Sequence, residues 1–161
     1  ARVTLIDVNP DRADLARDLG VAFATPDHAP GDQDVVIEAS GSPGGLATAL
    51  GLAGVEATVV VASWYGEGAV PVPLGGAFHS RRLTVRSSQV GRVPPARAPR
   101  FDFRRRLGAA LALLAGAPEL DRLVDAEVPF EQATEVLPRI TGPGGDSLCL
   151  RITYRGIPCS V

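Results

Sequence analysis

Short apolar runs alternate with amphipathic segments along the first two-thirds of the chain. Five of the six residues from 3 to 8 favour strands, and segment 11–19 carries apolar side chains at helical spacing before Gly20. Residues 57–63 are almost entirely apolar, as is typical of strands buried on both faces of a parallel sheet. The expected strands are 3–8, 21–24, 34–39, 57–63 and 83–87, and the expected helices are 11–19, 46–52 and 102–115. This alternation predicts an α/β fold with a doubly wound parallel sheet.

The last third of the chain has a different pattern. Segments 123–129 and 147–154 are strand-like, residues 130–140 are expected to form a helix, and Gly142–Gly145 predicts a loop. Earlier in the chain, Val70–Leu74 contains two prolines, which cannot donate to a sheet ladder, so we expect an extended edge there.

Composition excludes several classes of protein. With 161 residues, 45% of them hydrophobic, the chain is long enough to bury a core, and a net charge of −2 argues against a nucleic-acid-binding protein. All sixteen basic residues are Arg, a bias that we attribute to a GC-rich genome. The sequence contains neither a secretory signal nor an apolar run long enough for a membrane span, so we expect a cytoplasmic protein. Cys149 and Cys159 match no common zinc spacing and are expected to be free thiols.

Asp7 stands where the first strand ends, before a turn and a helix. In dinucleotide-binding folds a carboxylate at this place accepts hydrogen bonds from the adenosine ribose and repels a 2′-phosphate, which favours NAD over NADP. The alternative is a turn acid that bonds nearby backbone amides before Pro10. Such an acid normally lies about 20 residues after a glycine-rich phosphate loop, and here only six residues precede it.

The order of these segments resembles the medium-chain dehydrogenase/reductase superfamily, which includes the zinc-containing alcohol and polyol dehydrogenases. The resemblance runs from the second strand of the cofactor domain to the C-terminus, and Gly75–Arg82 is similar to a bacterial subgroup. The segments that carry it are Leu5–Arg12, Asp34–Gly41, Val59–Ser63, Ser87–Gln89 and Val128–Ala133. It implies an incomplete Rossmann-like domain at 1–122 and, at 123–161, a strand-helix-strand segment that returns to a catalytic domain.

Two parts of the family pattern are absent from the sequence, namely the strand with the GxGxxG turn and the domain that carries the zinc ligands. The missing strand is strand 1, which lies in the middle of the family's sheet. Without it we expect two strand groups whose facing edges are unpaired, and a chain that folds poorly on its own.

The resemblance also implies cofactor-binding residues beyond Asp7. Arg12 is similar to the basic residue that supports the ribose or covers the adenine, with an ordinary surface Arg as the alternative. Ser40 and Gly41 end a strand where the backbone approaches the adenosine half, or they simply form the loop into the next helix.

Four further residues, at the ends of two strands, are implied to meet the nicotinamide. Ser63 and Trp64 stand where relatives present backbone groups to the carboxamide. A Trp is unusual there and either narrows the pocket or caps the core. Ser87 and Gln89 resemble the segment that fixes the same carboxamide.

Other polar residues suggest no further site. The segment Arg81–Arg106 holds nine Arg and one acid, but prolines break it and few aromatics interleave, so a solvated surface is the preferred interpretation over a phosphate or nucleic-acid patch. His28 and His79 have no partner at metal-ligand spacing. We therefore assign no catalytic and no metal-binding residue.

By resemblance, the intact enzyme transfers hydride between a small alcohol and NAD, with zinc as a Lewis acid outside this chain. The chain alone is expected to be inactive, and the intact protein to be a homodimer or homotetramer that pairs through Val70–Leu74. One alternative is a non-enzymatic dinucleotide-binding or interaction module. Another is a zinc-free quinone reductase relative that prefers NADPH, against which Asp7 argues.

Overall fold

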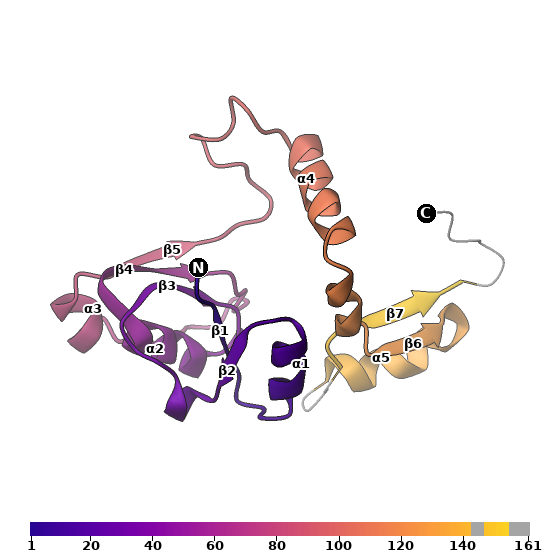
Figure 1. The fold of residues 1–161 in the computed structure, drawn as a ribbon, viewed down its shortest axis with the longest axis horizontal. Helices are drawn as coiled ribbons and strands as arrows, with labels where there is room; N and C mark the ends of the chain where they lie inside the picture. Colours follow the sequence, from indigo (N-terminus) through magenta and orange to yellow (C-terminus); the bar gives the residue numbers. More distant parts are fainter. Residues whose placement is uncertain (143–146, 155–161) are drawn as a thin grey trace. The chain divides into compact units, whose positions relative to one another are not determined.

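A computed structural model describes residues 1–142 and 147–154 (Figure 1). The chain divides into two compact units, Ala1–Arg104 and Arg105–Val161. This division falls ahead of the predicted boundary at residue 122. The predicted boundary separates a dinucleotide-binding part from a segment that returns to a catalytic domain. Compactness does not test this distinction, so the boundary stays a prediction.

The first unit begins with a βαβ arrangement. Strand β1 (Thr4–Ile6) pairs in parallel with β2 (Ala22–Ala24), and helix α1 (Arg12–Asp18) connects them. Ala16 of α1 is fully buried, and its carbonyl accepts a hydrogen bond from the Val21 N–H. Gly20 has a φ of 72°, in the left-handed region that ends many helices. These elements confirm the α/β alternation expected here, with shorter strands.

A second parallel sheet follows in the same unit, with the order β3-β4-β5. Its strands are β3 (Gln33–Glu38), β4 (Ala53–Val61) and β5 (Thr84–Ser87), and a short 3₁₀ turn, η1 (Pro26–His28), precedes β3. Helix α2 (Pro43–Leu52) connects β3 to β4, and α3 (Gly76–Ser80) precedes β5. Helix α2 begins earlier than expected because Ser42 caps it and Pro43 fits its first turn.

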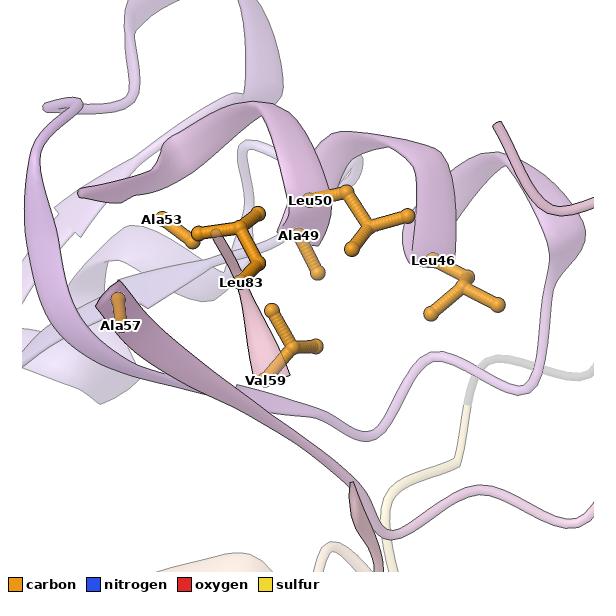
Figure 2. Packing of buried hydrophobic residues seen from close by; sticks show 7 residues of the cluster. All are labelled: Leu46, Ala49, Leu50, Ala53, Ala57, Val59 and Leu83. Carbon is orange, nitrogen blue, oxygen red and sulfur yellow. The ribbon is translucent and has the colours of Figure 1, made fainter. Parts of the chain in front are cut away.

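The main hydrophobic core lies between α2 and one face of this second sheet (Figure 2). Leu50 of α2 and Val59 of β4 are 2% and 0% exposed. Successive strand residues point to opposite faces, and on the other face Val35 and Ile37 are 58% and 68% exposed. In β4, where burial on both faces was expected, Ala57 and Val59 are buried and Thr58 and Val60 on the opposite face are half-buried, so full burial is found on one face only. The core residues are Leu46, Ala49, Leu50, Ala53, Ala57, Val59 and Leu83.

The two sheets of the first unit remain separate. Among the described residues no ladder joins β1 or β2 to β3, β4 or β5. This matches the two strand groups expected when the middle strand of the sheet is missing. Whether the chain folds poorly as a result stays a prediction.

Val70–Leu74 forms no strand, contrary to the expected extended edge. Pro71 and Pro73 have no N–H to donate, and the Leu74 N–H bonds locally to the Val72 carbonyl. In the structure β5 is an edge of its sheet instead.

The second unit contains a smaller parallel pair, β6 (Ala126–Pro129) with β7 (Leu150–Thr153). The remaining elements are α4 (Phe103–Ala115), which spans the division between the units, η2 (Pro118–Leu123), η3 (Phe130–Gln132) and α5 (Ala133–Thr141). The predicted loop at 142–145 lies largely outside the described residues, as does Cys159, whereas Cys149 is a free thiol. No helix in the described ranges is both long and apolar enough to cross a membrane.

Candidate functional site

Asp7 directly follows β1, at the carboxyl end of the β1-β2 sheet. Its side chain is half-buried, and the carboxylate Oδ1 accepts a hydrogen bond of 2.8 Å from the Asn9 N–H. This is the local turn bond that the alternative interpretation expects. Oδ2 accepts no hydrogen bond from the part of the chain that the structure describes. The carboxylate therefore retains an oxygen that can accept a hydrogen bond from a ligand. Arg12, the first residue of α1, is half-buried.

The second sheet presents its carboxyl ends in register. Glu38 of β3 pairs with Val61 of β4, which pairs with Ser87 of β5. The ladder continues past the strands, because the Ala62 N–H bonds to the Glu38 carbonyl and the Ser88 N–H to the Val61 carbonyl, each at 2.8 Å. Ligands of open α/β sheets bind outside this end of the strands.

The turn between β3 and α2 is bound to the end of β4. Gly41 has a φ of 67°, a conformation that favours glycine, and its N–H donates a 2.8 Å hydrogen bond to Ser63 Oγ. The next residue, Ser42, caps α2 by accepting a 3.0 Å bond from the Gly45 N–H. The structure thus joins the predicted Ser40–Gly41 turn to Ser63, which was predicted at a different strand end.

Glu38 lies beneath this turn and is only 3% exposed. Its Oε1 accepts hydrogen bonds from the Ser40 N–H at 2.7 Å and from Ser40 Oγ at 2.6 Å. Its Oε2 accepts a 2.5 Å bond from the Tyr65 hydroxyl. We call Glu38, Ser40, Ser63 and Tyr65 the rim network.

The rim network keeps Glu38 ionised and Tyr65 protonated. Burial acts to raise the pKa of Glu38, but hydrogen bonds from Ser40, Tyr65 and Ser63 outweigh it and hold that pKa below its ordinary value. Burial, together with the bond to the Glu38 carboxylate and its charge, raises the pKa of Tyr65 to about 12. At neutral pH the phenol therefore donates and the carboxylate accepts.

The other predicted residues lie at or beyond this end of the sheet. Trp64 is 80% exposed, so the alternative in which it caps the core is wrong. The side chain of Gln89 folds back, with Oε1 accepting a 2.6 Å bond from the Gly91 N–H. Ser87 and Gln89 line an open hollow of about 520 Å³ together with Arg86, Arg92 and Phe103.

The sequence alone did not reveal that Glu38 and Tyr65 form a hydrogen-bonded pair. The available signal was an acid that directly follows the apolar run Val35–Ile37, two residues after the core-facing Val36. That spacing places Glu38 on the covered face, where a carboxylate needs hydrogen-bond donors. Its partner Tyr65 lies 27 residues away along the chain, and no local pattern reveals the pair.

The arginine-rich segment has structural partners at its start. Arg81 Nη1 donates to the carbonyls of Gly51 and Ala53 at 3.0 and 2.7 Å, at the end of α2, and Arg82 forms an exposed ion pair with Glu56 at 3.2 Å. These contacts agree with the surface interpretation. Over residues 1–142 and 147–154, His, Cys, Asp and Glu form no group suited to a metal ion.

No family model matches the chain, and no curated protein matches it. Solved structures do share its fold. L-idonate 5-dehydrogenase from Escherichia coli aligns over 96% of this chain with a TM-score of 0.71 and 20% identity. A zinc-binding dehydrogenase structure from Sinorhizobium meliloti, bound to NADP, aligns over 96% with a TM-score of 0.65 and 23% identity. The protein yhfP from Bacillus subtilis, with NAD bound, aligns over 94% with a TM-score of 0.66 and 18% identity.

Alcohol dehydrogenases are among the other matches. The chain therefore has the fold found in alcohol dehydrogenases and in a zinc-binding dehydrogenase, which confirms the resemblance at the level of the fold. The chain spans 43% of the E. coli chain, 44% of the S. meliloti chain and 46% of the B. subtilis chain, less than half of each.

Proposed function

We propose that this chain is the nucleotide-binding part of an NAD-dependent oxidoreductase that acts on a small alcohol or polyol. The observation that carries the proposal is the position of Asp7, directly after β1, with one carboxylate oxygen that accepts no hydrogen bond from the described residues. In a dinucleotide-binding sheet this is the end of the strand at which the adenosine ribose is bound. The fold shared with dehydrogenases supports the same assignment.

The proposed roles divide between the two sheets. Asp7 accepts hydrogen bonds from the ribose hydroxyls, with Arg12 beside the same ribose. Gly41 allows the backbone to approach the adenosine half. Ser63 and Trp64 follow β4, Ser87 ends β5, and Gln89 follows it. We assign these residues to the nicotinamide carboxamide.

The nicotinamide supplies the chemistry by accepting or releasing a hydride when it is bound. This chain binds and orients the cofactor and supplies no catalytic group of its own. The described residues form no zinc site, so any zinc in the intact enzyme is held by residues elsewhere. We propose that the intact protein is a homodimer or homotetramer. Val70–Leu74 forms no strand, so the structure does not support pairing of subunits through that segment.

Calorimetric titration of NAD and NADP into the chain tests the assignment of Asp7. Hydrogen bonds to a charged group contribute about 1.5–3 kcal/mol each, so Asp7→Asn should weaken NAD binding by roughly 10- to 150-fold. It should also reduce discrimination against NADP, because the repulsion of the 2′-phosphate is removed.

Asp14→Asn is the matched control. Asp14 lies on α1, and among the described residues its side chain forms only an exposed ion pair with Arg17. The NAD affinity of Asp14→Asn should therefore equal that of the wild type. Equal affinity of wild type and Asp7→Asn would refute the role of Asp7. Binding of NAD without turnover by any longer protein that contains the chain would favour a non-enzymatic module.

A further inference from the structure

Glu38 is the only charged residue in the described parts of the chain that is buried. A buried carboxylate loses hydration, and replacing such groups by apolar residues is often neutral or stabilising in proteins. Stability alone is therefore a weak reason for an acid here. Its location suggests another reason, because Glu38 is the last residue of β3 and lies at the end of the sheet where ligands bind.

The two oxygens of Glu38 bond to different elements. Oε1 binds the turn that follows β3, through the backbone and hydroxyl of Ser40, and Oε2 binds Tyr65 beyond the end of β4. Ser63 belongs to the same set of contacts, since it accepts a hydrogen bond from the Gly41 N–H and helps to lower the pKa of Glu38. One carboxylate thus joins two segments that are far apart in the sequence.

The turn is closely packed around Ser40. A Cβ on Gly45 would lie 1.9 Å from Ser40 Oγ and 2.7 Å from Ser40 Cβ. Ser40 Oγ also accepts a 3.2 Å bond from the Ser42 N–H, and Ser42 caps α2. The position of Ser40, set by Glu38, therefore affects both the cap of α2 and the backbone at Gly41.

We propose that Glu38 is a positioning residue for nucleotide binding, which holds the Ser40–Gly41 turn against Ser63 and Tyr65 so that both halves of the dinucleotide meet a preformed surface. The inference rests on the proposed function and extends it. Asp7 selects the ribose, whereas Glu38 touches no ligand and acts through the residues around it. Preformed surfaces bind more tightly because less freedom is lost when the ligand binds.

Two measurements on Glu38→Gln and Tyr65→Phe test this role. The first is amide hydrogen exchange at Ser40 and Gly41 without ligand, which should be accelerated about tenfold or more in each variant, because a hydrogen bond to a charged group is lost or weakened. The second is the dissociation constant for NAD, which should rise about tenfold because the same hydrogen bond is lost or weakened. Exchange at Ala49 and Leu50 in α2 should not change.

Glu56→Gln is the control, since Glu56 lies in β4 but is exposed and pairs only with Arg82. It should change neither measurement. Unchanged exchange at Ser40 and Gly41 in both variants would overturn the proposal, as would faster exchange with unaltered NAD affinity. If Glu38→Gln unfolds, with fast exchange throughout α2, Tyr65→Phe decides by the same two readouts.

The result for the wild type separates this inference from the proposed function. A wild type whose circular dichroism shows that it is folded but that binds no NAD refutes the proposed function, and the positioning role falls with it. A wild type that binds NAD through Asp7, with Glu38→Gln and Tyr65→Phe binding equally well, refutes the positioning role alone.

Discussion

The ionisation of Tyr65 offers a direct measurement of the rim network. Burial and the Glu38 carboxylate raise its pKa from 10.0 to about 12. The chain has two tyrosines and no lysine, so few other groups titrate in this pH window. A Tyr154→Phe background leaves Tyr65 as the only phenol. Its phenolate absorbance should then appear with a midpoint near pH 12.

The same shift predicts a loss of stability at alkaline pH. The folded-state pKa is raised, so the contribution of the neutral phenol is fully present below about pH 10 and disappears as the pH rises to about 12. Two pH units correspond to about 2.7 kcal/mol, but Tyr65 is only partly buried, so solvent screening reduces the expected loss to roughly 1–2 kcal/mol. Urea unfolding across this range measures the loss.

Replacing the partner provides the decisive comparison. Glu38→Gln in the Tyr154→Phe background removes the negative charge beside the phenol, so the midpoint should move toward 10.0. Circular dichroism identifies the pH values at which the fold persists, and the midpoint is read only there. A midpoint near pH 10 with and without Glu38 would refute the reasoning.

Three further predictions concern the second sheet. Leu50→Ala should lower the free energy of unfolding by about 2–5 kcal/mol, because Leu50 is 2% exposed in the core, and a loss below about 1 kcal/mol in urea unfolding would contradict this packing. Gly45→Ala should be less stable than Gly44→Ala by about 1–2 kcal/mol in thermal unfolding, because a Cβ at position 45 meets Ser40 whereas one at position 44 meets nothing within 4 Å. Equal stability of the two variants would show that Ser40 moves without cost. The pKa of Glu38 is lowered, so its contribution to stability is present above its ordinary pKa of 4.5 and is lost as the pH falls through the folded-state value. The acid unfolding profile of Glu38→Gln should lack this part of the pH dependence, and superimposable profiles would contradict the assignment.

The order of elements could be predicted from the sequence because it depends on local patterns. The apolar run at 57–63 and the amphipathic segment at 11–19 mark a strand and a helix through spacing alone. The separation of the two strand groups could be predicted as well, because the strand order that the resemblance implies places another strand between them. Asp7 was found by the same means, since it marks the end of a strand.

Tertiary structure decided which side chains meet. Glu38 and Tyr65 lie 27 residues apart, and only the parallel register of β3 with β4 brings the phenol to the carboxylate. The open face of β3, with Val35 and Ile37 exposed, was also beyond prediction, because an apolar run looks the same whether one face or both are covered. Local sequence specifies the elements through backbone preference and periodicity. Partners and burial depend on contacts between distant segments, and these form only when the sheet does.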